Sequence, residues 1–308
     1  MKTINLIIDT DPGVDDATAI ILAMFNKNLD IKLITTTAGN VGLEKTTRNA
    51  LFLVEKFGKD IQVCKGSLKP ILRENKNAIS VHGEEGLGGF IPTKTNLKPC
   101  SEDVVETMFE TIKQNAGNIT ILELAPQTNL GLLFEKHPEV QDMINEIIFE
   151  GGSPYGRPNT KPHVSFNISC DPEAADIVMK SKVKKTIMPS EIGRYNAYFS
   201  SDQIKEIKNT NKTGKFLAKM FEGYKSDVIL NATETNDLSA VIYLLYPEIF
   251  KTSKCDIEVD LNDNPGKTTI TENPNGNITF VEQTDRDLFF KKFIENLKNI
   301  KDSDIVNI

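Results

Sequence analysis

Residues 4–17 read Ile-Asn-Leu-Ile-Ile-Asp-Thr-Asp-Pro-Gly-Val-Asp-Asp-Ala, and the fold can be worked out from this stretch. The apolar run Ile4–Ile8 predicts a short buried strand, and four acids follow it closely. The spacing of apolar residues over Asp16–Phe25 predicts a helix. Ligands of open parallel sheets bind outside the carboxyl ends of the strands. The acids therefore stand where such a sheet would carry a functional site.

Short apolar runs continue to alternate with helical patterns along the chain. This alternation predicts an α/β fold, a single domain over residues 1–308 with a mostly parallel open central sheet flanked by helices. No internal repeat or linker divides the sequence. We expect further strands at Ile31–Thr37, Ile61–Val63, Ile119–Leu124, Ile147–Phe149 and Lys185–Met188, and further helices at Thr46–Phe57, Asp103–Gln114, from Asn129, at Pro172–Lys180 and at Leu238–Leu245.

Composition narrows the class of protein. With 36 basic and 43 acidic side chains the net charge is −7, which argues against a nucleic-acid partner because a phosphate-binding surface needs basic excess. The 4 cysteines form no CxxC pair, which favours a reducing compartment over zinc ligation or disulfides. No apolar run approaches the length of a membrane span, so no membrane partner is expected. These features predict a cytoplasmic protein.

The acids Asp9, Asp11, Asp15 and Asp16 admit two interpretations. In the simpler one, Asp15 and Asp16 only cap a helix, where carboxylates favour the positive end of the dipole. Four acids at a buried strand end would repel one another and partly protonate unless a cation neutralised them. A set of oxygen ligands without His or Cys suits a hard ion, Ca²⁺ or Mg²⁺. The cluster thus predicts a metal site, with helix capping as the alternative.

Several motifs resemble those of one known family. Residues 9–17, Asp-Thr-Asp-Pro-Gly-Val-Asp-Asp-Ala, look like the signature of the inosine-uridine-preferring nucleoside hydrolases. The resemblance implies the nucleoside hydrolase fold and a homodimer or homotetramer. Further stretches keep the order and approximate spacing of that family over nearly the whole chain: Thr36–Asn40, Val81–Leu87, Ala125–Leu130, Gly151-Gly152, Phe166-Asn167, Asp171–Ala175 and Asn236–Val241.

The resemblance also implies a reaction and a set of site residues. The reaction is calcium-dependent hydrolysis of the N-glycosidic bond of ribonucleosides, giving ribose and a free purine or pyrimidine base, as in nucleoside salvage. Asp11 would act as general base on a metal-bound water, and Asp9 would support it from behind. The expected Ca²⁺ ligands are Asp11, Asp16, Asp237 and the main-chain carbonyl of Leu124. The residues expected to bind the nucleoside are Asp15, Asn40, His82, Glu150, Asn159, Asn167 and Asn236.

The chain departs from the family pattern at several positions. Ser165 stands where the family commonly has Glu on the ribose, and Glu150 stands where Met is frequent. Asn236 replaces a frequent His that helps the base to leave, and a neutral amide cannot protonate a leaving base at neutral pH. Other side chains could help the base to leave, or a substrate with an activated leaving group could react without such help. The candidates for it are His82, Tyr224 and His163.

Each of these candidates has a simpler interpretation, and two other functions stay open. His82 lies in a Gly-rich loop that it could merely anchor, Tyr224 could belong to the core, and His163 could lie on the surface. The same scaffold could hydrolyse a different ribosyl compound, as the changes at Ser165 and Asn236 suggest. It could also be a non-catalytic, metal-dependent nucleoside- or ribose-binding protein.

Overall fold

The computed structural model describes residues 3–101, 103–156, 160–224 and 232–306. Within these ranges one sheet runs in the order β3-β2-β1-β4-β5-β6-β9-β7-β8. Its strands are β1 Ile4–Thr10, β2 Leu29–Thr36, β3 Val63–Lys65, β4 Ile119–Glu123, β5 Glu146–Glu150, β6 Lys185–Met188, β7 Phe250–Val259, β8 Thr268–Glu272 and β9 Ile278–Thr284.

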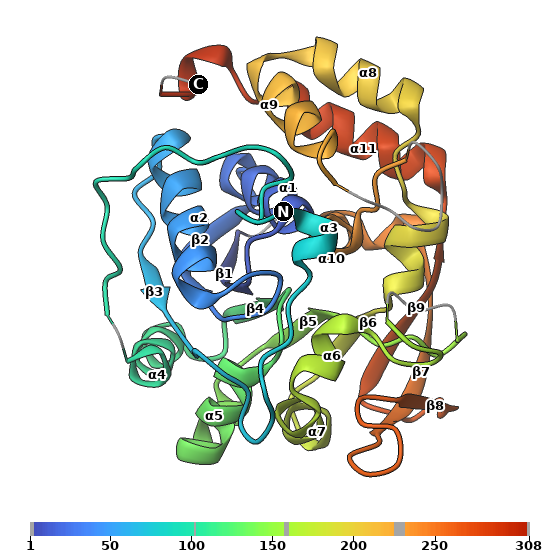
Figure 1. Cartoon of the computed structure of the whole chain (residues 1–308). Coiled ribbons are helices and arrows are strands. Elements are labelled where there is room, and N and C mark those ends of the chain that lie inside the picture. The colour runs from blue at the N-terminus through green and yellow to red at the C-terminus, as the bar shows by residue number, and fades with distance from the viewer. Residues whose placement is uncertain (1–2, 102, 157–159, 225–231, 307–308) are drawn as a thin grey trace.

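Helices lie on both faces of this sheet (Figure 1). They are α1 Val14–Phe25, α2 Leu43–Lys56, α3 Ile79–His82, α4 Val104–Gln114, α5 Thr128–Lys136, α6 Phe166–Cys170, α7 Pro172–Lys180, α8 Ser201–Thr210, α9 Lys212–Phe221, α10 Asn236–Leu245 and α11 Arg286–Lys298. None of the helices in the described ranges combines the length and apolar character that crossing a membrane requires.

Strand β1 shows why the sheet needs two layers of helices. Successive side chains of a strand point to opposite faces. Leu6 and Ile8 accordingly join the core formed with α1, α2, α9, α10 and α11, while Ile7 joins the core formed with α4, α5 and α7. All three are fully buried, and each contributes roughly 1.5–3 kcal/mol of hydrophobic stabilisation. A strand buried on both faces reads as a continuous apolar run, as this one does.

The order of the strands places a crevice beside β1. From β1 the chain passes outward to β2 and β3, and then returns to add β4, β5 and β6 on the other side of β1. The strands β1 to β6 all pair in parallel. The direction of winding reverses between β1 and β4, which is the topological switch point where open α/β sheets bind ligands. Thr10 and Glu123 end these two strands.

The predicted α/β fold with a mostly parallel sheet flanked by helices is confirmed. The sequence did not predict the far edge, where β7 pairs antiparallel with both β8 and β9. Much of β7 is half-buried or exposed, and it carries Lys, Ser and Glu between its buried residues. An antiparallel edge with one solvated face lacks the continuous apolar runs that identify the inner strands.

Candidate active site

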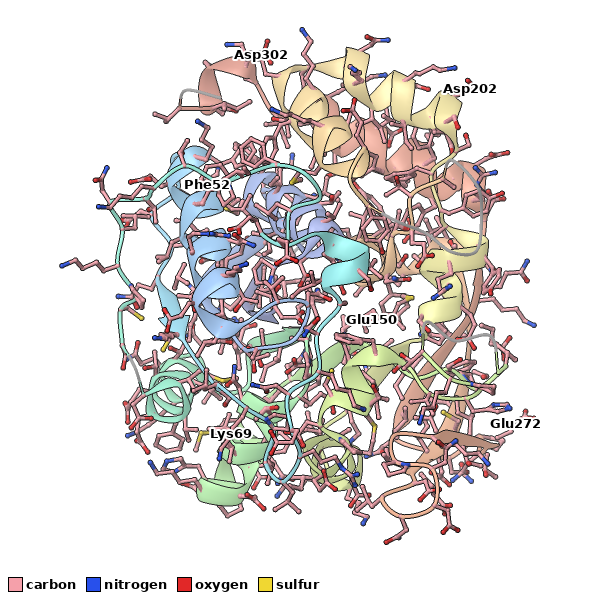
Figure 2. All side chains as sticks on the ribbon, viewed as in Figure 1. Phe52, Lys69, Glu150, Asp202, Glu272 and Asp302 are labelled. Atoms are coloured by element: carbon pink, nitrogen blue, oxygen red, sulfur yellow. The ribbon has the colours of Figure 1, made fainter. Side chains whose placement is uncertain are left out.

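A cavity of about 310 Å³ opens at the carboxyl ends of the inner strands. Figure 2 shows Glu150, one of its lining residues, near the centre of the molecule, with Asp202, Glu272 and Asp302 at the periphery. The lining residues come from segments far apart in the sequence: Asp15, Asn40, Ala78, Ser80, Val81, His82, Leu124, Glu150, Phe166, Asn167, Arg194, Tyr224, Glu234, Asn236 and Asp237.

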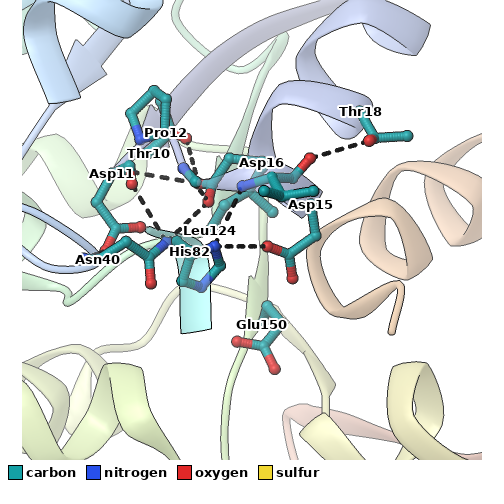
Figure 3. A network of polar contacts seen from close by, with 12 residues as sticks. Thr10, Asp11, Pro12, Asp15, Asp16, Thr18, Asn40, His82, Leu124 and Glu150 are labelled. Atoms are coloured by element: carbon teal, nitrogen blue, oxygen red, sulfur yellow. Dashed lines mark hydrogen bonds and ion pairs between the residues drawn. The ribbon is translucent and has the colours of Figure 1, made fainter. Parts of the chain in front are cut away.

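Asp11 lies just behind the cavity lining and is fully buried. Its Oδ2 accepts a hydrogen bond of 2.6 Å from the main-chain N–H of Asn40 (Figure 3). This approach depends on Gly39, because a Cβ there would lie 1.9 Å from Asp11 Oδ2. The other oxygen, Oδ1, is buried and has no hydrogen-bond partner among the described residues. Burial and repulsion from Asp16 raise the pKa of Asp11 well above its usual value.

Asp16 organises the turn between β1 and α1. It sits in the first turn of α1, where its Oδ2 accepts from the Gly13 N–H at 2.9 Å, so the expected capping role is real. The same oxygen accepts from Asn40 Nδ2 at 3.0 Å, and its Oδ1 accepts from the Thr10 hydroxyl. Capping alone would not need these tertiary bonds. Asp16 therefore both caps the helix and ties the ends of β1 and β2 together.

Three carboxylates converge beside this turn. Asp15, Asp16 and Asp237 each offer an oxygen atom, and these atoms lie within 4.8 Å of one another. Burial, followed by repulsion from Asp16, raises the pKa of Asp15 to about 8. Burial and then Asp15 and Asp16 raise the pKa of Asp237 well above its usual value. Such crowding favours a bound cation, and the oxygen donors with the partnerless Asp11 Oδ1 fit a hard divalent ion.

A second pair of acids lies behind Asp11. Asp9 accepts hydrogen bonds from Thr35 Oγ1 at 2.6 Å and from Asn129 Nδ2 at 2.8 Å. Burial raises its pKa to about 6. Burial and repulsion from Asp9 raise the pKa of Glu123 well above its usual value. We did not predict Glu123 as a site residue, although an acid ending an apolar strand was visible in the sequence.

Asn167 joins the ends of β4 and β5. Its Nδ2 donates to the Leu124 carbonyl at 2.9 Å and to Glu150 Oε2, also at 2.9 Å. A carbonyl oxygen has two lone pairs, so the Leu124 carbonyl keeps one for another partner. Burial and repulsion from Asp15 raise the pKa of Glu150 well above its usual value. Figure 3 shows Glu150 across a short gap from Asp15.

His82 anchors its loop and also lines the cavity, while its predicted contact with the base stays a prediction. Its Nδ1 accepts a hydrogen bond of 3.2 Å from the Val14 N–H, which anchors α3 to the start of α1, and its ring lines the cavity. Burial lowers the pKa of His82 to about 3, so the ring is neutral although it lies 3.9 Å from Asp15 Oδ1. Tyr224 stacks edge-on against it at 5.2 Å between ring centroids and also lines the cavity.

The other residues that the sequence analysis singled out differ in whether they line the cavity. His163 is not a lining residue; its Nδ1 contacts the Pro154 carbonyl at 3.0 Å instead. Ser165 is buried with its Oγ accepting from the Gly152 N–H at 2.7 Å, so it holds a loop. Asn236 does line the cavity, and its buried Oδ1 lacks a hydrogen-bond partner in the described ranges. Asn159 lies outside the described residues.

Two further lining residues, Arg194 and Glu234, were missed by the sequence analysis. They lie 3.7 Å apart from Arg194 Nε to Glu234 Oε2, and both are buried. One weak sign is visible in the sequence, since Glu234 stands two positions before Asn236. Arg194 stands alone in an irregular stretch, and only the tertiary structure brings it to the cavity.

Comparison with known proteins agrees with this geometry. Residues 6–291 match the model of the family described as inosine-uridine preferring nucleoside hydrolase. The chain belongs to this family. As a nucleoside hydrolase it is 36% identical over 255 residues to the non-specific ribonucleoside hydrolase RihC of Escherichia coli O127:H6, covering 83% of each chain. It is 36% identical over 258 residues to RihC of Salmonella paratyphi B, covering 84% of each chain.

Solved structures of nucleoside hydrolases share the fold of this family member. The plant nucleoside hydrolase PpNRh1 superposes with a TM-score of 0.89 at 28% identity, over 96% of this chain and 98% of its own. The purine-preferring ribonucleoside hydrolase from Gardnerella vaginalis gives a TM-score of 0.90 at 25% identity, over 97% and 99%. The predicted family and fold are therefore confirmed. The roles of individual residues stay predictions.

Proposed function

We propose that this nucleoside hydrolase cleaves the N-glycosidic bond of ribonucleosides to give ribose and a free purine or pyrimidine base. The observation that carries the proposal is the cavity at the topological switch point, into which Asp15, Asn40 and Asp237 converge. Its volume of about 310 Å³ lies within the range of small-molecule sites. The names of the RihC relatives point to the same substrate class.

The carboxylate cluster is proposed to hold Ca²⁺ through Asp11, Asp16, Asp237 and the Leu124 carbonyl. The partnerless Asp11 Oδ1 and the grouping of Asp16 with Asp237 support this set. Asp15 offers an oxygen atom to the same group of carboxylates. It also lines the cavity, and this position supports its predicted contact with the sugar. The chemistry that a divalent ion would supply at these residues is a lower pKa for a bound water molecule.

Asp11 is proposed as the general base. Its Oδ2 accepts a hydrogen bond from the Asn40 N–H, which orients the carboxylate that would take a proton from the attacking water. Gly39 and Asn40 fix the position of Asp11, so little reorganisation is needed during the reaction.

The sugar is proposed to bind along the carboxylates and amides of the lining. Hydrolysis of a glycosidic bond builds positive charge on the sugar ring, and nearby carboxylates stabilise that charge. Hydrogen bonds to the hydroxyl groups would hold the ribose so that its anomeric carbon faces the water. The residues proposed for these contacts and for the base are Asp15, Asn40, His82, Glu150, Asn167 and Asn236, with the predicted Asn159 outside the described residues.

The test is a panel of purine and pyrimidine ribonucleosides incubated with the purified chain, with products separated by chromatography. We expect ribose and base in equal amounts, no turnover after treatment with a chelator, and recovery when Ca²⁺ is restored. Mg²⁺ added in its place distinguishes the two hard ions. Absence of product from every nucleoside and from para-nitrophenyl riboside would overturn the proposal.

The changes from the family pattern at Asn236 and Ser165 leave two alternative functions open, and the same experiment distinguishes them. Tight nucleoside binding by calorimetry without any product would indicate a non-catalytic nucleoside- or ribose-binding protein. Cleavage of another ribosyl compound, with ribonucleosides left intact, would indicate a changed substrate. We further propose that residues 1–308 form one domain and that the protein is cytoplasmic. We also propose that it acts in nucleoside salvage and forms a homodimer or homotetramer. Gel filtration with light scattering tests the last of these.

A further inference from the structure

The cavity carries one permanently charged cation that no step described above uses. Among the described lining residues, Arg194 is the sole arginine or lysine. Its side chain is 3% exposed, and Glu234, with which it makes an ion pair, is 7% exposed. A buried guanidinium is costly to desolvate, and it is tolerated where a carboxylate or a ligand compensates its charge. The position of Arg194 against the cavity therefore calls for a functional explanation.

The local backbone sets Arg194 next to Asn236. Arg194 lies in a π-helical turn, Ile192–Asn196, a rare conformation that is frequent at functional sites. A Cβ on Gly193 would lie 2.5 Å from Asn236 Oδ1, so the glycine permits close contact between the turn and the start of α10. The Thr235 N–H also donates to the Gly193 carbonyl at 3.3 Å. Arg194 is thereby held beside the position where the family frequently has a His that helps the base to leave.

The proposed hydrolysis needs such help. When the C1′–N bond breaks, its electron pair stays on the base nitrogen, and an unprotonated purine or pyrimidine leaves as an anion. The Asn236 amide cannot supply a proton, and His82 is neutral because burial lowers its pKa to about 3. Burial, with the charges of Asp15 and Glu234, raises the pKa of Tyr224 well above 10 and weakens it as an acid. Among the described lining residues, Arg194 offers a fixed positive charge that can stabilise the departing base.

We propose that Arg194 is the catalytic residue on the leaving-group side: its guanidinium stabilises the negative charge of the departing base, and Glu234 orients it. This inference rests on the proposed function. The water oxygen bonds to C1′, Asp11 takes the water proton, and the base departs as an anion that is later protonated by solvent. Arg194 donates hydrogen bonds to that anion and keeps its own protons, because arginine does not deprotonate in proteins. Preorganised donors of this kind stabilise developing charge strongly in a site that excludes water.

The test compares substrates that differ in leaving group. Para-nitrophenyl riboside releases a stable phenolate, so it needs little stabilisation on that side. For Arg194→Gln we expect kcat on inosine and uridine to fall roughly 10²–10³-fold, as for loss of an oxyanion-hole donor. Turnover of para-nitrophenyl riboside by the same variant should change little. Added guanidinium ion should restore part of the activity on inosine.

Controls separate catalysis from folding. Arg286→Gln is the matched variant, because Arg286 donates to the Tyr198 carbonyl at 3.1 Å and lies outside the cavity lining. It should leave both substrates unaffected. Arg194→Lys keeps the charge without the planar fork, and its loss should be smaller and still selective for inosine. It also serves if Arg194→Gln fails to fold, as judged by circular dichroism and thermal melting.

The outcomes are distinguishable. An equal loss on both substrates by folded Arg194→Gln or Arg194→Lys would make Arg194 structural and overturn the inference, as would unchanged turnover of inosine. Failure of the wild-type chain to cleave either substrate would instead overturn the proposed function. A loss confined to the nucleosides, with rescue by guanidinium, is the result that the inference predicts.

Discussion

The two sides of the cavity are built in different ways. The acidic side (Asp11, Asp15, Asp16, Asn40) comes from two neighbouring strand ends, and hydrogen bonds such as Asn40 N–H to Asp11 at 2.6 Å fix its groups. The base side (Arg194, Tyr224, Glu234, Asn236) comes from remote segments, and Asn236 Oδ1 has no hydrogen-bond partner within the described ranges. The site thus combines a part that hydrogen bonds hold at neighbouring strand ends with a part that is built from remote segments of the chain. We infer that the first part carries the shared reaction and the second sets how the base leaves.

The largest effect should come from the acidic side. Asp11→Asn keeps the shape of the side chain but removes the proposed base, so kcat on inosine should fall roughly 10²–10⁴-fold. Stability should hold or rise, because a crowded buried charge is removed. Steady-state kinetics and thermal melting measure both. A folded Asp11→Asn variant with most of the wild-type kcat would contradict the assignment.

A smaller effect is expected between the two sides, at Glu150. Glu150→Gln keeps the size of the side chain and changes the carboxyl group that accepts from Asn167 at 2.9 Å into an amide. A typical hydrogen bond contributes about 0.5–1.5 kcal/mol, so KM for inosine should rise roughly two- to tenfold. Glu146→Gln, at the start of the same strand, is the matched control. Equal KM values for the two variants would remove Glu150 from the sugar site.

The smallest effect concerns acid stability and His82. Burial lowers its pKa from 6.5 to about 3, so the unfolded chain binds this proton more readily than the folded one. Stability should therefore fall as pH drops below about 6.5, by about 2 kcal/mol at pH 5 from this group alone. His82→Asn keeps an acceptor for the Val14 N–H without titrating, and should lack this part of the loss.

Urea unfolding of wild type and His82→Asn at pH 7 and pH 5 gives the comparison. The stability of wild type relative to His82→Asn should be about 2 kcal/mol lower at pH 5 than at pH 7. A constant difference across this range would mean that His82 is not held neutral in the fold.

The inner sheet was predictable because its strands are buried on both faces. Runs such as Ile4–Ile8 and Ile119–Leu124 predict the positions of β1 and β4. The strand β7 was missed, since its Lys and Glu residues face solvent and its alternation is irregular. Helices α8 and α11 also went unnamed, because their sequences are largely polar.

The same distinction holds within the site. Asp11, Asp16 and Asn40 are close in space because adjacent parallel strands end together, which local sequence already implies. Arg194 reaches the cavity through a π-helical turn that no propensity predicts. Glu123 lies opposite Asp9 across paired strands, a placement that depends on the register between β1 and β4. Asp11, Asp16 and Asn40 were predicted because their placement follows from strand order. Arg194, placed by irregular backbone, and Glu123, placed by strand register, were not.

The most direct test of the division between the two sides is a crystal structure of Asp11→Asn grown with Ca²⁺ and inosine. We predict the ion beside Asp16, Asp237 and the Leu124 carbonyl, the ribose against Asp15 and Asn40, and the base against Arg194 and Asn236. A base bound on the acidic side, or a ribose held by Arg194 and Glu234, would contradict the account.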